Sequence, residues 1–111
     1  MKSISQMIDL EGKRALITGA NGNLGKHLAI TIAELGGDLV LVDMPGKINK
    51  ELNSYLNNNF DVNVEFIECN LENPDDRKEL IRKVSNQKEP LNILINNAAF
   101  VGTSQLKGWS T

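Results

Sequence analysis

A glycine-rich loop near the start of the chain places the strongest constraint on its fold. Residues 18–25 read T-G-A-N-G-N-L-G, with three glycines at the spacing G-x-x-G-x-x-G. The apolar run Arg14–Thr18 before the loop predicts a buried strand, and the helical spacing of apolar residues in Leu24–Leu35 predicts a helix after it, ended by Gly36-Gly37. Backbone N–H groups at the start of such a helix can face an anion. The loop therefore predicts a strand–turn–helix unit that can bind a phosphate group.

Three further apolar runs alternate with helical patterns along the chain. They are Leu39–Val42, Val62–Cys69 and Leu91–Ile95. Strands that are apolar at successive positions are typical of a parallel sheet with helices on both faces. Right-handed crossovers then predict the strand order 3-2-1-4, with the switch point between the first and fourth strands.

Two more helices are expected between these strands. The second helix is marked by the apolar positions Ile48, Leu52, Tyr55 and Leu56, and Asn57–Asn59 is expected to break it. The third begins with Asn73 as the N-cap, with Pro74 in the first turn and the acidic pair Asp75 and Asp76 complementing the helix dipole. Its buried face is expected to consist of Leu80, Ile81 and Val84.

Composition limits the classes of partner. The 111 residues suit one domain or part of one, and the formal net charge of -2 disfavours nucleic acid as a partner. No apolar run approaches the roughly 20 residues of a membrane span. Cys69 is the single cysteine, which fits a reducing compartment. We expect a cytoplasmic protein with no membrane partner and, because the acidic residues lack metal-ligand partners, no metal site.

An acidic residue follows the second strand. Asp43 lies 18 positions after Gly25, where dinucleotide-binding folds place a carboxylate that accepts from the ribose hydroxyls of the adenosine. A carboxylate there repels the extra phosphate of NADP, and no Arg or Lys lies inside the loop. NAD is therefore preferred over NADP. Asp43 also suits the turn at Met44-Pro45-Gly46, and that use is compatible with ribose binding.

A third motif completes a family resemblance. Asn96-Asn97-Ala98-Ala99 ends the fourth strand, and the opening segment reads L-E-G-K-R-A-L-I-T-G from Leu10. Together with the glycine loop and Asp43, these residues resemble the short-chain dehydrogenase/reductase family from about Leu10 to about Val101. The resemblance implies the N-terminal half of a Rossmann-type α/β fold, a doubly wound parallel sheet with about four strands and three helices. Residues 1–111 would be an incomplete NAD(P)-binding domain.

The resemblance also implies a set of cofactor-binding residues. Those expected near the pyrophosphate and its ribose are Gly19, Asn21, Gly22, Asn23, Leu24 and Gly25. Those expected on the adenosine side are Asp43 and Met44 at the ribose and Asn70 and Leu71 at the adenine ring. Those expected under the cofactor near the nicotinamide ribose are Asn97, Ala98 and Ala99.

The chain departs from the family pattern in three places. The most common branch of the family would have glycine at position 23, where this chain has Asn23. This chain has Gly22 instead, and that spacing matches the sugar-nucleotide epimerase branch. Asn70 stands where the family usually has Asp. The catalytic Tyr-x-x-x-Lys has no counterpart, because the single tyrosine, Tyr55, is followed four positions later by Asn59. We therefore expect a truncated chain, with the catalytic segment absent and no catalytic residue to assign.

Three functions follow from these patterns. The first is an NAD-dependent oxidoreductase acting on a hydroxyl/carbonyl pair, for which the intact protein would have a small-molecule substrate and form a homo-oligomer. The alternatives are a sugar-nucleotide epimerase or dehydratase and a non-catalytic dinucleotide-binding protein. His27 is expected to be a partly exposed helix residue and Cys69 a core residue, while Phe100–Thr111 is expected to be a loop. An unpaired fourth strand predicts marginal stability or association.

Overall fold

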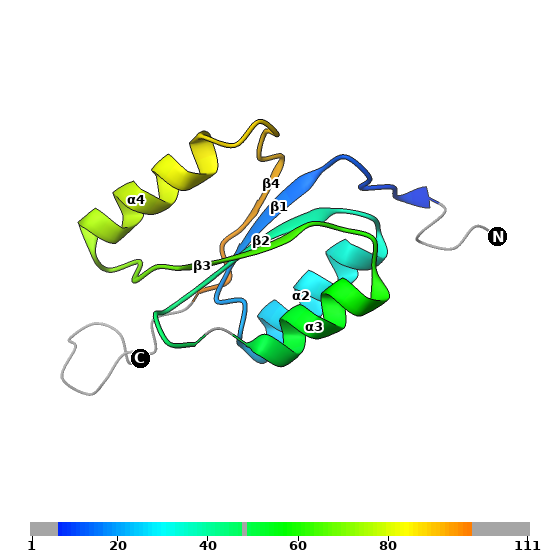
Figure 1. Ribbon diagram of the computed structural model, residues 1–111, viewed down its shortest axis with the longest axis horizontal. Helices are drawn as coiled ribbons and strands as arrows, with labels where there is room; N and C mark the ends of the chain where they lie inside the picture. Colours follow the sequence, from blue (N-terminus) through cyan, green and yellow to red (C-terminus); the bar gives the residue numbers. More distant parts are fainter. Residues whose placement is uncertain (1–6, 48, 99–111) are drawn as a thin grey trace, which may run out of the picture.

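The computed structural model describes residues 7–47 and 49–98, which form one parallel sheet with helices on both faces (Figure 1). The strands are β1 (Arg14–Thr18), β2 (Asp38–Asp43), β3 (Val64–Glu68) and β4 (Ile93–Ile95). The helices between them are α2 (Asn23–Glu34), α3 (Lys50–Asn59) and α4 (Pro74–Ser85). The strand order is β3-β2-β1-β4, so the predicted order 3-2-1-4 is confirmed.

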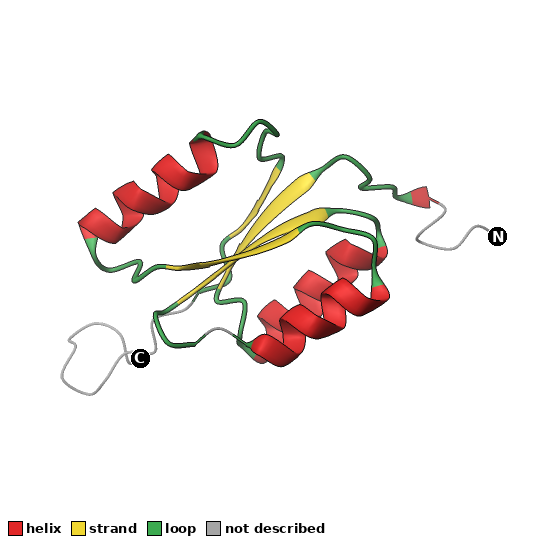
Figure 2. Ribbon diagram, in the orientation of Figure 1, coloured by secondary structure: helices red, strands yellow, loops and turns green. Residues whose placement is uncertain are grey.

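Each strand contributes side chains to both faces of the sheet, because successive side chains point in opposite directions. Ala15, Ile17, Leu39 and Leu41 belong to one core cluster, shared with the buried residues of α2 and α3. Figure 2 shows these two helices side by side on that face. The small residues Ala29 and Ala33 are the buried positions of α2 in this cluster. Gly25, in the first turn of α2, is also buried.

The opposite face is covered by α4. Leu16, Val40 and Val42 form a second core cluster with Ile67, Cys69 and Leu80. The nearly continuous apolar sequences of β1 and β2 therefore follow from burial of both of their faces. Cys69 is 2% exposed, which confirms its place in the core.

The predicted helix ends are confirmed at two positions. Gly36 adopts a φ of +88° just after the C-cap of α2, a left-handed conformation that favours glycine. At the start of α4, the Asn73 side-chain oxygen accepts from the backbone N–H groups of Asp75 and Asp76 at 2.9 and 3.2 Å. Pro74 is the first residue of that helix.

The expected break at Asn57–Asn59 is wrong. Helix α3 continues through these residues and ends at Asn59. The asparagine side chains bond within the helix, since the Asn57 amide donates to the side chain of Asn53 and the Asn59 amide donates to the Tyr55 carbonyl. The helix therefore continues through the asparagines, because two of their side chains find hydrogen-bond partners one turn earlier.

Two apolar helix residues lie outside the core, contrary to their helical spacing. Ile81 is 64% exposed and Leu24 is 61% exposed. The buried stripe of α4 contains Leu80 with the partly buried Val84, and Ile81 lies beside that stripe. Ile48, Ala99 and the expected loop Phe100–Thr111 lie outside the described residues. Within the described part of the chain, no helix is long and apolar enough to cross a membrane.

Candidate functional site

The glycine loop connects β1 to α2 at the carboxyl edge of the sheet. Gly19 has a φ of +65°, and a Cβ built on it would lie 3.0 Å from the Cα of Ala98. Both the backbone conformation and this close approach to the segment after β4 require glycine. The loop and the segment that follows β4 are therefore packed backbone to backbone.

Gly25 and Gly22 differ in what the fold demands of them. A Cβ at Gly25 would lie 2.2 Å from the Gly19 carbonyl oxygen, so the first turn of α2 packs directly on the loop. At Gly22 the φ is -69°, and the nearest atom to an added Cβ is the Gly19 oxygen at 3.4 Å, an ordinary contact. The fold requires glycine at position 25 and does not require it at position 22. A close approach of a ligand to the backbone would explain Gly22.

The N-terminus of α2 has the features of an anion site. Gly22 is its N-cap, no side chain caps the helix, and its first turn contains no acidic residue. By contrast, α3 and α4 are capped by the side chains of Asn49 and Asn73. Uncapped N–H groups and the positive end of the helix dipole both favour a bound anion.

Asp43 lies directly beside this loop. Its Oδ2 accepts from the backbone N–H of Asn21 and its Oδ1 accepts from the backbone N–H of Met44, each at 2.8 Å. The side chain is half-buried. Each carboxylate oxygen has a further lone pair, so Asp43 can still accept from a sugar hydroxyl. The contact from β2 to the loop places the acid next to the anion site.

Asn21 provides a test of whether the loop suits a polar ligand. Its side-chain oxygen is buried, and no hydrogen-bond donor reaches it among the described residues. A buried acceptor without a donor costs free energy, so a ligand hydroxyl in this loop would remove that cost. Gly22, the uncapped helix and Asn21 together fit the diphosphate and ribose of a dinucleotide.

Thr18 joins the loop to the Asn96–Ala98 segment, and it was not among the expected site residues. Its hydroxyl oxygen accepts from the backbone N–H groups of Asn97 and Ala98 at 3.0 and 2.9 Å and donates to the Asn96 side chain at 3.2 Å. The Asn97 side chain donates in turn to the Gly19 carbonyl at 3.2 Å. The signal in the sequence was a threonine at the end of a buried strand, where an apolar residue would otherwise be expected.

Asn70 and Leu71 follow β3 at the same edge of the sheet. The Asn70 backbone N–H donates to Asp76 at 2.9 Å, while its side-chain oxygen accepts from the Glu72 N–H at 3.1 Å. Leu71 packs against the cluster under α4. The Cys69 N–H donates to the Asp43 carbonyl at 2.9 Å, which ties the segment to the last residue of β2. The ends of β1, β2, β3 and β4 thus bring most of the expected residues together, and Ala99 lies outside the described residues.

The other titratable candidates lie away from this edge or within the core. His27 is exposed on α2, and Tyr55 is 45% exposed on α3. Burial raises the pKa of the Cys69 thiol, and the nearby Asp76 carboxylate raises it further. In the described part of the chain, no group of three or more His, Cys, Asp or Glu residues could hold a metal ion.

A family model for short chain dehydrogenase matches residues 13–110 of the chain. The chain belongs to the short-chain dehydrogenase/reductase family. This chain is 38% identical over 92 residues to the 3-oxoacyl-[acyl-carrier-protein] reductase FabG of Rickettsia typhi. The matched residues make up 83% of this chain and 35% of that relative. This chain therefore covers about a third of the length of the relatives that it matches.

Solved structures share the fold. The L-sorbose reductase of Gluconobacter frateurii, solved with NADPH and L-sorbose, superposes with a TM-score of 0.75 at 27% identity, over 83% of this chain and 35% of that one. An oxidoreductase structure from Haemophilus influenza that holds bound NAD superposes with a TM-score of 0.75 at 24% identity, over 88% of this chain and 35% of the other. The first of these two structures thus holds NADPH and the second holds NAD.

Proposed function

We propose that this chain binds NAD(H) across the carboxyl edge of its sheet and forms the cofactor-binding part of an oxidoreductase that acts on a hydroxyl/carbonyl pair. The observation that carries this proposal is the contact between Asp43 and the backbone N–H of Asn21, at 2.8 Å. It places a carboxylate that can bind ribose beside the uncapped start of α2, which can bind the pyrophosphate.

Different residues at this edge would bind different parts of the cofactor. The start of α2 would hold the pyrophosphate, with Gly22 allowing its close approach and the Asn21 oxygen accepting from a hydroxyl. Asp43 and Met44 would hold the adenosine ribose, with Asn70 and Leu71 beside the adenine. The bound cofactor supplies a nicotinamide ring that gives or accepts hydride. The Asn97–Ala98 segment, held in position by Thr18, would support that end of the cofactor.

The proposed choice of NAD rests on charge. Asp43 would lie close to the 2′-phosphate of NADP, and like charges at that distance repel. The loop Gly19–Gly25 contains no Arg or Lys to offset the repulsion. The related structures bind NADPH or NAD, so this residue, and not the fold, is expected to decide the preference.

Acid/base catalysis is not assigned to residues of this chain. Tyr55 lies on α3, and the residue four positions later, Asn59, uses its side chain to bond the Tyr55 carbonyl. The chain covers 35% of the length of the FabG relative. The acid/base group, the small-molecule substrate and a homo-oligomeric assembly are therefore proposed for the intact protein.

A second candidate function rests on the spacing of the glycine loop. Glycine at positions 19, 22 and 25 matches the sugar-nucleotide epimerase branch, and the fold does not itself require Gly22. An epimerase or dehydratase would use the same dinucleotide site and would also bind a nucleotide sugar. Binding of UDP-glucose in addition to NAD would favour this second function over the first.

Calorimetric titration with NAD and NADP tests the proposal. The wild-type chain should bind NAD, with NADP weaker by about tenfold or more, which corresponds to about 1.4 kcal/mol. Asp43→Asn removes the charge and should reduce that preference, while Asp61→Asn removes an exposed charge elsewhere and should leave it unchanged. Equal binding of the two cofactors by the wild-type chain would contradict the assigned role of Asp43.

A further inference from the structure

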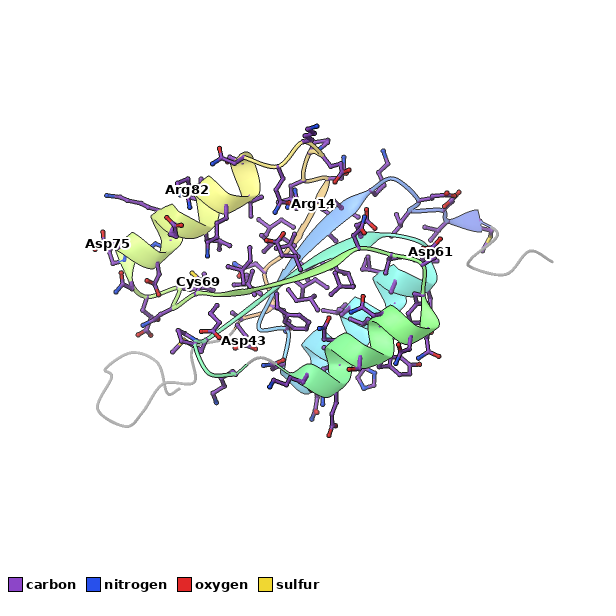
Figure 3. All side chains as sticks on the ribbon, viewed as in Figure 1. Arg14, Asp43, Asp61, Cys69, Asp75 and Arg82 are labelled. Atoms are coloured by element: carbon purple, nitrogen blue, oxygen red, sulfur yellow. The ribbon has the colours of Figure 1, made fainter. Side chains whose placement is uncertain are left out.

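A second concave surface lies at the opposite edge of the sheet. A pocket of about 340 Å³ is lined by residues at the amino ends of β1, β2 and β3, by residues that follow α4 and by Asn57 of α3. Figure 3 labels Arg14 and Asp43, which lie at opposite ends of the sheet. This pocket is therefore separate from the proposed dinucleotide site.

A buried arginine lines the pocket. Arg14 is 5% exposed, and its Nη1 donates to the backbone carbonyl of Glu89 at 3.0 Å. Across residues 7–47 and 49–98, the buried Nη2 has no hydrogen-bond partner. The ion pair found in that part of the chain joins Arg82 and Glu79 and does not involve Arg14. A buried guanidinium without an anionic partner is costly, so an oxygen anion bound at Nη2 would be stabilised.

Three acidic residues are among the other residues that line the pocket. Asp38, Glu65 and Glu89 all border the pocket. Asp38 accepts from the Asn63 backbone N–H at 2.8 Å, and Glu65 accepts from the side chain of Gln87. Three carboxylates border the same pocket as one guanidinium, so a simple anion would be attracted by Arg14 and repelled by the acidic residues. A simple cation would leave Nη2 without an acceptor.

We propose that this pocket binds a small zwitterion of the amino-acid type. Its carboxylate would accept from the Nη2 of Arg14, and its ammonium group would face Glu65 and the neighbouring carboxylates. A zwitterion carries one charge for the guanidinium and one for the carboxylates that line the same pocket, and guanidinium binds carboxylates in a fixed geometry. Zwitterion binding in this pocket does not depend on NAD binding, which is proposed for the other edge.

Amide NMR titration of the full chain with three matched probes tests the proposal. The probes are L-alanine, propionate, which lacks the ammonium group, and ethylamine, which lacks the carboxylate. In a chain with a dispersed amide spectrum, L-alanine should give saturable shifts around Arg14 and Glu65. Propionate and ethylamine should bind weaker by about fivefold or more, because each lacks one of the two charges.

Two pairs of variants complete the test. Arg14→Met should weaken L-alanine binding by about tenfold or more, while the exposed control Arg82→Met should not change it. Glu65→Gln should weaken the binding of L-alanine and should not weaken the binding of propionate. This variant tests the pocket with Arg14 unchanged. Propionate binding as tightly as L-alanine, unchanged binding in Arg14→Met, or an absence of saturable shifts in the folded chain would each overturn the proposal.

Discussion

The Thr18 hydroxyl oxygen accepts a hydrogen bond from the backbone N–H of Ala98 at 2.9 Å, which joins the end of β1 to the segment after β4. Thr18 is 5% exposed, so loss of the hydroxyl would leave the Asn97 and Ala98 N–H groups without their acceptor in a part-buried place. Thr18→Val keeps the shape of the side chain and should lower the free energy of unfolding by about 1–3 kcal/mol. Urea unfolding followed by circular dichroism measures this change.

Thr18→Ser is the matched control for that variant. Serine keeps the oxygen that accepts both bonds and loses only a methyl group, so its loss of stability should be about 1 kcal/mol or less. If the valine and serine variants lose the same stability, the hydroxyl does not hold the two segments together.

Gly22 and Gly25 form a second matched pair. Gly25→Ala places a Cβ 2.2 Å from the Gly19 oxygen and should disrupt the loop, with a loss of stability of about 1–3 kcal/mol. Gly22→Ala meets only an ordinary contact at 3.4 Å and should keep the stability within about 0.5 kcal/mol, yet weaken NAD binding by obstructing the pyrophosphate. Thermal unfolding and NAD titration of both variants separate these effects. A Gly22→Ala variant that binds NAD normally would show that the backbone does not approach the ligand there.

The Cys69 thiol predicts a loss of stability at alkaline pH. Burial first, and the Asp76 carboxylate second, raise its pKa in the folded state. The unfolded thiol ionises near pH 8.5, so its contribution to stability is fully present below that pH and is lost as the pH rises through the folded value. Urea unfolding between pH 7 and pH 10 should show this loss for the wild-type chain and a smaller one for Cys69→Ala. Equal slopes in both chains would contradict the assignment to Cys69.

The outer edge of β4 predicts self-association of the isolated chain. β4 pairs with β1, and no other described strand pairs with its second edge. Leu94 in β4 is 65% exposed and Ile81 on α4 is 64% exposed. Leu94→Lys should reduce association in sedimentation velocity experiments, while Ile8→Lys, outside the sheet, should not. A monodisperse wild-type monomer with a cooperative, high-temperature melt would contradict this prediction.

Sequence alone predicted the strand order and the placement of Asp43, because both follow from strong local patterns. Continuous apolar runs required two covered faces, and the interval from Gly25 to Asp43 matched a known βαβ geometry. The burial of Ile81 was predicted wrongly because its position beside a narrow apolar stripe depends on how α4 docks on the sheet. That docking is a tertiary property.

Long-range contacts account for what the sequence did not reveal. The bonds from Thr18 to residues 96–98 span about 80 positions, so a threonine at the end of a buried strand does not by itself indicate its partners. The pocket around Arg14 likewise combines the starts of three strands with the segment after α4. A charged residue at the start of a strand is expected to face solvent, and its burial became visible only in the assembled fold.

Mapping of NAD onto the chain by amide chemical shifts tests the central claim most directly. Saturable shifts should concentrate at Asn21–Gly25 and at Asp43 and Met44, with little change around Arg14 and Glu65 at the opposite edge. Shifts that avoid the glycine loop, or none at saturating NAD in a folded chain, would show that the carboxyl edge of this sheet does not bind the dinucleotide.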